Sequence, residues 1–154
     1  MRLSTRGPLS SSDARAAILS SHEELRGLVS ETIHVADDAT RSARDCEPLR
    51  AHAKDLCAAF AAHIDFEERL LATALGDVIG WGPVLREQIE ADHQRQRASL
   101  ATALSALEPA DVSRGRLVES VRALADTLLG DLDGEERYLL TADLDALAND
   151  SEGG

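Results

Sequence analysis

Four long stretches of the sequence repeat apolar side chains at the spacing of one face of an α-helix, and no stretch alternates with the period of a β-strand. Leucine and alanine dominate, while aromatic and β-branched residues are sparse, and this composition favours helices. At 154 residues, the chain is long enough for one domain with a proper core. We therefore predict an all-α fold, an antiparallel up-down-up-down four-helix bundle.

Capping residues and prolines predict where the helices begin and end. Ser11, Ser12 and Asp13 are N-cap candidates for the first helix, Pro48 and Pro83 suit the first turns of the second and third, and Ser113 caps the fourth. The predicted helices run to about residues 44, 75, 107 and 142, with a loop over residues 76–83. We expect a flexible leader over residues 1–10, the bundle over 11–142 and a polar C-terminal tail over 143–154.

Each helix has a stripe of side chains that should face the core, and every stripe contains a histidine or a carboxylate. The predicted stripes are, helix by helix, Ile18, His22, Leu25, Val29, Ile33 and Ala36; Leu49, His52, Leu56, Ala59, His63, Glu67, Leu70 and Ala74; Leu85, Ile89, His93, Leu100, Leu104 and Leu107; and Leu117, Val121, Leu124, Leu128, Asp131, Glu135 and Leu139.

One pair of polar residues recurs in two helices. His63 and Glu67 are four residues apart, so they lie one turn above the other on a single helix face. The segment that contains them resembles Asp131–Leu140, in which Asp131 takes the place of His63 and Glu135 that of Glu67. Two matching turns on two helices predict a pseudo-symmetric site between them.

Six polar side chains should meet in one layer of the core: His22, His63, Glu67, His93, Asp131 and Glu135. Burying a lone carboxylate or an unpaired imidazole costs several kcal/mol, so a metal centre is the simplest explanation of the set. A single such histidine is more often a hydrogen-bonded core residue. Glu68 and Glu136 are interpreted as surface charges, His34 as peripheral, and His52 as a residue of the core or of the bundle mouth.

The donor types indicate the metal. Imidazole and carboxylate without thiolate suit two iron or manganese ions, with zinc as an alternative. Glu67 and Glu135 are placed to bridge the two ions. His22 with His63 would complete one ion and His93 with Asp131 the other, which leaves open positions for water, an oxo or hydroxo bridge, or dioxygen.

In these residues, over about positions 14–142, the chain resembles the hemerythrin-like (HHE cation-binding) family. The matching features are His22, the His63–Glu67 pair, His93, and a fourth-helix pair that departs from the family pattern because position 131 is Asp. The resemblance implies a non-haem di-iron centre that binds O2 or reacts with peroxide or another small oxidant. Oxygen carriers have a second histidine where this chain has Arg97, which argues against reversible O2 carriage.

Charge and cysteine content limit the partners. The net charge of −12 argues against nucleic acid and anionic membranes, because both bind a positive surface. Cys46 and Cys57 form neither a disulfide framework nor a metal pair, and Cys57 should be a small buried side chain. The N-terminal residues lack the apolar run of a signal peptide, so a cytoplasmic monomer or homodimer is expected.

Two functions from different classes remain open at this point. The first is a di-iron protein of oxygen or redox sensing, scavenging or iron handling, in which an oxidase or peroxidase-like activity is undecided. The alternative is a non-catalytic signalling or interaction bundle with a degenerate or single-metal site. A hydrolytic enzyme has less support, because no nucleophile or phosphate-binding loop is evident.

Overall fold

The computed structural model describes residues 11–41, 45–75 and 82–139. Four helices account for almost all of them: α1 (Ser11–Arg41), α2 (Glu47–Leu75), α3 (Gly82–Leu107) and α4 (Arg114–Leu139). Within these ranges there is no strand, so the all-α prediction is confirmed. The predicted leader, the loop residues 76–81 and the C-terminal tail lie outside the described residues.

The predicted helix starts have identifiable local causes. The Ser113 hydroxyl accepts a hydrogen bond from the backbone N–H of Arg116 at 3.3 Å, which confirms it as the N-cap of α4. Asp45 Oδ1 accepts one from the N–H of Glu47 at 3.2 Å, and Pro48 stands in the first turn of α2. The first amide groups of a helix have no partner within it. At these starts the Ser113 and Asp45 side chains accept a hydrogen bond from such an amide, and Pro48 has no N–H to satisfy.

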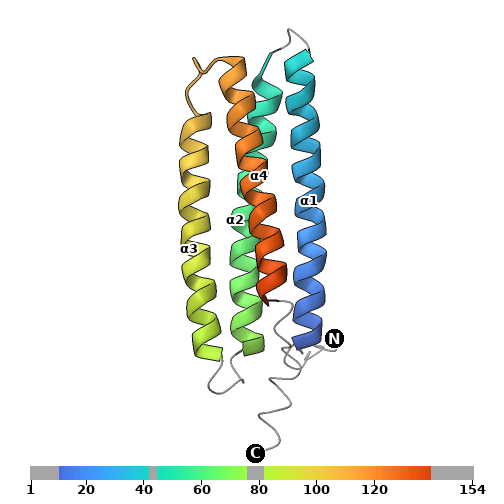
Figure 1. Cartoon of the computed structure of the whole chain (residues 1–154), viewed down its shortest axis with the longest axis vertical. Helices are drawn as coiled ribbons and strands as arrows, with labels where there is room; N and C mark the ends of the chain where they lie inside the picture. The colour runs from blue at the N-terminus through green and yellow to red at the C-terminus, as the bar shows by residue number, and fades with distance from the viewer. Residues whose placement is uncertain (1–10, 42–44, 76–81, 140–154) are drawn as a thin grey trace, which may run out of the picture.

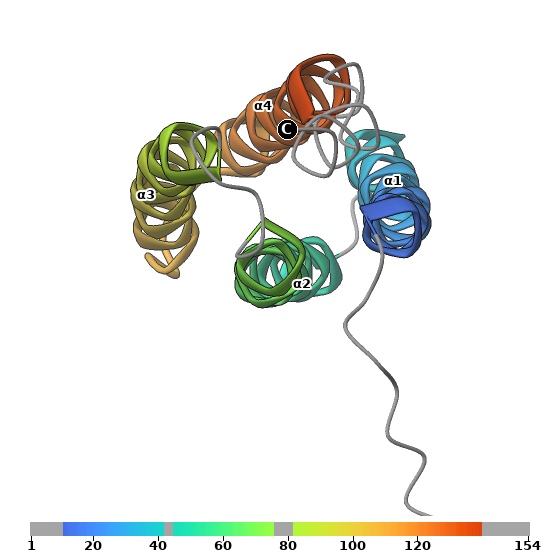
Figure 2. The same ribbon diagram turned by 90° about the horizontal axis from the view of Figure 1, so that it is seen from below.

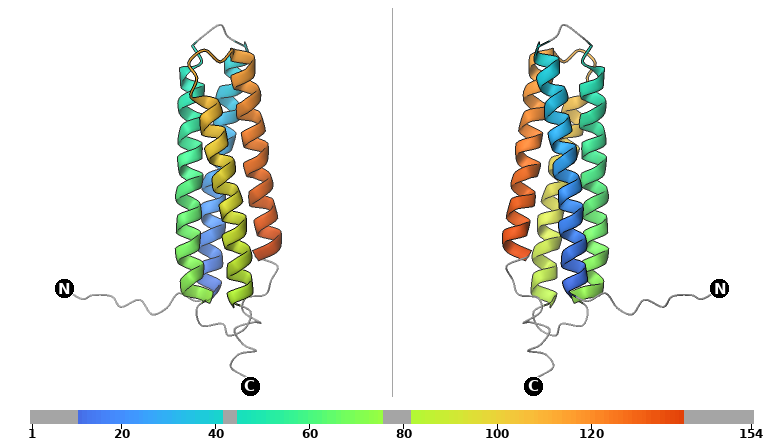
Figure 3. Two further views of the ribbon diagram at one scale, coloured as in Figure 1. Left: turned by 90° about the vertical axis from the view of Figure 1, so that its left-hand side faces the viewer. Right: turned by 90° about the vertical axis from the view of Figure 1, so that its right-hand side faces the viewer.

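The four helices lie side by side along one long axis (Figures 1 and 3). The colour gradient in Figure 1 runs upward along α1 and α3 and downward along α2 and α4. α1 packs against α2 and α4, and α2 packs against α3, whereas the contact between α3 and α4 is much sparser. Viewed from one end, the helices surround a common centre (Figure 2). Within the described ranges, no helix has an apolar stretch able to cross a membrane.

The core is a seam whose positions advance alternately by three and four residues. The seam positions on α2 are Leu49, Ala53, Leu56, Phe60, His63 and Glu67, and on α1 they are Ile18, His22, Leu25, Val29, Thr32, Ala36 and Ala39, all of them buried. This is the heptad pattern of helices that wind around one another. The apolar part of the seam forms two clusters, one around Leu56 and Leu128 and one around Leu49 and Leu117.

The heptad pattern explains where the predicted stripes were wrong. His52 is exposed, because the seam of α2 passes through Ala53 instead. Leu104 is 36% exposed, because partly buried Ala103 occupies the corresponding place on α3. His34 is exposed and Cys57 is buried, as expected. Three further stripe residues, Ala74, Leu85 and Leu139, lie where side chains are not described.

Replacing Leu100 and Leu104 separately by alanine tests this seam. Leu100 is 5% exposed, so Leu100→Ala should lower the free energy of unfolding by about 2–5 kcal/mol, since it leaves a cavity. Leu104→Ala removes a side chain that is one-third exposed and should cost less than half as much. Urea denaturation of both variants measures the difference, and equal losses would contradict the heptad assignment.

Candidate metal centre

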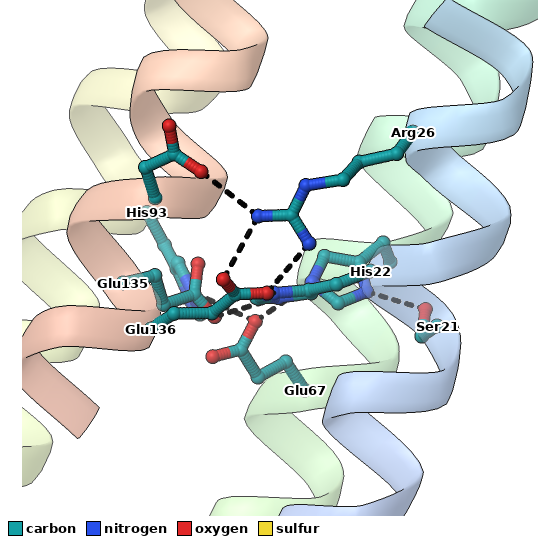
Figure 4. Close-up of polar contacts among 9 residues, drawn as sticks. Ser21, His22, Arg26, Glu67, His93, Glu135 and Glu136 are labelled. Atoms are coloured by element: carbon teal, nitrogen blue, oxygen red, sulfur yellow. Dashed lines mark hydrogen bonds and ion pairs between the residues drawn. The ribbon is translucent and has the colours of Figure 1, made fainter. Parts of the chain in front are cut away.

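Four of the six predicted ligands come together between α1, α2 and α4. His22 lies on α1, His63 and Glu67 on α2, and Glu135 on α4, and one donor atom from each lies within 4.8 Å of every other. Glu67 and Glu135 face His22 across the space between the helices (Figure 4). His22 and Glu67 are fully buried, and the side chain of Glu135 is 11% exposed. We call these four residues the four-ligand cluster.

Five donor atoms of the four-ligand cluster are buried without a hydrogen-bond partner. They are His22 Nε2, His63 Nε2, both carboxylate oxygens of Glu67, and Glu135 Oε1. His63 Nε2 lies 2.9 Å from Glu67 Oε2, although the pair lacks hydrogen-bond geometry. Each unsatisfied buried polar atom costs about 1–3 kcal/mol, and five of them facing one another form a surface that fits a cation.

The opposite ring nitrogen of each nearby histidine is held by a neighbour. His22 Nδ1 donates to Glu136 Oε1 at 3.1 Å, and His93 Nδ1 donates to Glu68 Oε1 at 3.1 Å. His63 Nδ1 is hydrogen-bonded to Ser21 Oγ at 2.7 Å. Because Nδ1 is engaged, Nε2 is the nitrogen left to bind a metal, which is the usual arrangement around metal-binding histidines.

Glu68 and Glu136 are therefore not the surface charges predicted from the sequence. Their side chains are 33% and 26% exposed, and each is also bound by an arginine through both carboxylate oxygens. Arg26 binds Glu136 at 2.7 and 2.8 Å and Asp133 at 2.9 Å (Figure 4). We call this set the Arg26 clamp, since it joins α1 to α4.

A second clamp repeats the first between α3 and α2. Arg97 binds Glu68 at 2.9 and 3.1 Å and Asp65 at 2.7 Å. Each arginine stands four residues after a histidine, His22 or His93. The α1–α2 and α3–α4 hairpins therefore carry matching polar residues in the same order, except that Asp131 stands where the first hairpin has His63. The recurring His-x-x-x-Arg and Asp-x-Glu-Glu spacings were the sequence signal for the clamps, which the sequence analysis missed.

The other two predicted ligands lie next to the four-ligand cluster. His93 is 2% exposed, and its Nε2 lies 3.8 Å from Glu67 Oε2. Asp131 is half-buried on α4 and, with His93, lines a cavity between α3 and α4. The site thus consists of the four-ligand cluster, with the imidazole of His93 and the carboxylate of Asp131 beside it on the side of α3 and α4.

Burial and proximity shift the acid–base chemistry of the cluster. Burial, together with the neighbouring Glu135, raises the pKa of Glu67 to about 11. Burial also lowers the pKa of His63 to about 4 and outweighs the attraction of Glu135. Burial opposes the charge on Glu135 as well, but the nearby side chains of His22 and Glu67 outweigh it and hold the pKa of Glu135 below its usual value. Without a cation, Glu67 is therefore the protonated member of this carboxyl pair and His63 is neutral.

Comparison of the chain with protein-family models, with curated proteins and with solved structures finds no match. Any function proposed for the chain therefore rests on its sequence and on the geometry of the site.

Replacing Glu67 by glutamine tests the protonation of the metal-free cluster. The unfolded chain releases the Glu67 proton near its ordinary pKa of 4.5, whereas the folded chain keeps it up to about 11. Stability must therefore fall as pH rises between these values, by up to about 1.4 kcal/mol per pH unit. Glu67→Gln should reduce this slope between pH 7.5 and 8.5, where His63 is neutral in the folded chain and almost entirely neutral in the unfolded chain.

Urea unfolding of chelator-treated protein measures the slope, and Glu87→Gln, an exposed carboxylate on α3, is the control. Identical slopes for wild type and Glu67→Gln would show that Glu67 is ionised in the folded, metal-free protein.

Proposed function

We propose that this chain is a hemerythrin-like, non-haem iron protein built as an antiparallel up-down-up-down bundle. In this proposal it binds two iron ions and reacts with O2, peroxide or a similar small oxidant, in redox sensing, scavenging or iron handling. Manganese and zinc are the alternative metals. The observation that carries the proposal is the set of five buried donor atoms without partners in the four-ligand cluster.

The donor chemistry supports iron. Two imidazole nitrogens and two carboxylates form a mixed nitrogen–oxygen set of the kind that binds iron and manganese. Neither cysteine belongs to the cluster, since Cys57 packs in the apolar core and Cys46 precedes α2. Iron held there would supply a redox-active centre for a small oxidant.

The protein's own residues would do three things at such a centre. His22 and His63 would bind through Nε2, since Nδ1 of each is hydrogen-bonded elsewhere. Glu67 would give up its proton on binding, and both of its oxygens, which have no hydrogen-bond partner, would be available to the metal. The apolar residues above the cluster, among them Leu25, Ile64 and Leu132, exclude bulk water.

Arg97 supports chemistry other than reversible oxygen carriage. In oxygen-carrying members of the hemerythrin-like family this position is a histidine that binds metal. In this chain the Arg97 guanidinium binds Glu68 and Asp65 instead. The side chain that would complete a more histidine-rich site instead holds the partner of His93 in place. Carboxylate donors favour the ferric state, which suits oxidation chemistry or iron handling.

A single-metal bundle without catalysis is the second candidate. The observation in its favour is that the four converging donors do not include Asp131, which replaces a histidine of the family pattern. One ion in the four-ligand cluster would take one donor atom from each of its four residues. The number of metal ions per chain separates the two candidates.

Iron analysis after iron-replete expression tests the main proposal. We expect about two iron ions per chain and a near-ultraviolet oxo-ferric band, and both should be lost in His63→Ala, because that nitrogen is a proposed ligand. His52→Ala is the matched control, since His52 lies on the same helix but is exposed. One ion per chain would favour the single-metal candidate, and metal-free, colourless wild-type protein would refute both.

Replacing Arg26 by methionine tests the clamp as a positioning device. Loss of the guanidinium frees Glu136, so the His22 ring is held less firmly, and the metal dissociation constant should rise about 10–100-fold. Arg122→Met is the control, because Arg122 also joins α4 to α1, through Asp37 at 2.8 Å, in an exposed ion pair. Equal affinities in the two variants would reduce the clamp to an ordinary salt bridge.

A further inference from the structure

A cavity of about 300 Å3 lies between α3 and α4 beside the four-ligand cluster. Its inner wall includes His93 and Glu135, and Glu135 contributes one of the unpartnered oxygens. Two other cavities are placed elsewhere. One is lined by Ser, Thr, Ala and Leu side chains further along the α3–α4 seam, and the other lies where α1 meets the start of α2. Of these three cavities, the first adjoins a residue of the cluster.

The internal repeat shows why this cavity exists. Five of its lining residues are Asp92, Gln96, Gly130, Asp131 and Gly134. Their counterparts in the α1–α2 hairpin are Ser21, Leu25, Ala62, His63 and Phe66. Each counterpart is larger or less polar. The first hairpin fills this space, and the second leaves it open, in agreement with the sparse contact between α3 and α4.

The glycines on α4 keep the outer part of the cavity open. Gly130 and Gly134 are one turn apart, both are exposed, and a Cβ atom added at either would meet no atom within 4 Å. Close packing therefore does not require glycine at these positions. In the first hairpin the counterpart of Gly134 is Phe66, whose ring centroid lies 6.5 Å from that of His63.

The charge of the cavity favours cations. Three lining carboxylates, Asp92, Asp131 and Glu135, are opposed by one lining guanidinium, Arg95, which lies 3.3 Å from Asp92. A recess with an excess of negative charge raises the local concentration of cations and their rate of entry. Two further lining side chains, Ile89 and Gln96, are uncharged.

From these observations we propose that the α3–α4 cavity is the port through which a divalent cation enters and leaves the buried cluster. The proposal rests on the metal-binding function above and adds the route and its charge selectivity. The ion passes between the two glycines of α4 on one side and Asp92 of α3 on the other. Asp131 then draws it inward to Glu135, which belongs to the cluster. The α1–α2 side stays closed, because His63, Phe66 and Leu25 fill the equivalent space.

Closing the port with a phenylalanine tests the route. Gly134→Phe restores the residue type found in the first hairpin and should slow both Co2+ loading and chelator-driven release by about tenfold or more, since exchange would then require local opening of the bundle. The dissociation constant and stoichiometry should stay unchanged. Stopped-flow absorbance of the cobalt d–d bands gives the two rates, and circular dichroism checks folding.

Gly27→Phe is the matched control, because Gly27 is an exposed mid-helix glycine on α1 with no atom within 4 Å of an added Cβ. Wild-type rates in Gly134→Phe, with Co2+ still bound, would overturn the port and leave the metal site intact. Wild-type protein that binds no Co2+ would overturn the metal site and the port together.

A charge variant gives an independent test that does not alter the width of the port. Arg95→Gln removes the opposing positive charge and should speed Co2+ loading about two- to threefold at low salt, with the difference shrinking as salt rises. Arg116→Gln, an exposed arginine in the first turn of α4, is the control. Equal acceleration in both variants, or none in Arg95→Gln, would refute electrostatic guidance by the cavity.

Discussion

The structure depends on keeping five unpartnered donor atoms together inside an apolar bundle. Without a cation, desolvation works against every charged form, and the folded chain responds by keeping a proton on Glu67 and none on His63. An apolar seam without these groups would be more stable, so the bundle carries them at a cost. A bound cation would offset that cost, because its positive charge would give the carboxylate oxygens and imidazole nitrogens the partner that they lack.

The two arginine clamps hold this buried polar layer from outside. Arg26 and Arg97 use bidentate geometry, which fixes the plane of Glu136 and Glu68 and, through them, the rings of His22 and His93. Each clamp joins helices from different hairpins, so it ties the relative position of the hairpins to the orientation of a donor. Partly exposed ion pairs contribute little to stability by themselves. The role of these ion pairs is to fix the orientation of the His22 and His93 rings.

Much of this arrangement was readable from the sequence, and the failures have physical causes. Histidines and carboxylates that interrupt an apolar stripe are visible without a structure, which is why His22, His63, Glu67 and Glu135 were predicted together. His52 and Leu104 were misplaced because the predicted stripes took the three- and four-residue steps in the wrong order, whereas the seam passes through Ala53 and Ala103. Glu68 was missed because it starts one position off the seam, and only its length lets the carboxylate reach back to His93.

The two hairpins of the internal repeat differ in how tightly they pack. A four-helix bundle with two fully packed hairpins would enclose its cluster on every side, and its contents could exchange only when helices separate. Here the repeated polar residues keep the same positions in both halves, while the residues around Asp131 are reduced in size or made polar. The scaffold that holds the donors is therefore preserved in both hairpins, and the packing that would seal them is preserved in only one. Asp131, at the position that His63 occupies in the first hairpin, fits such an opening, because a shorter acidic side chain leaves space and attracts cations, whereas an imidazole would fill the space.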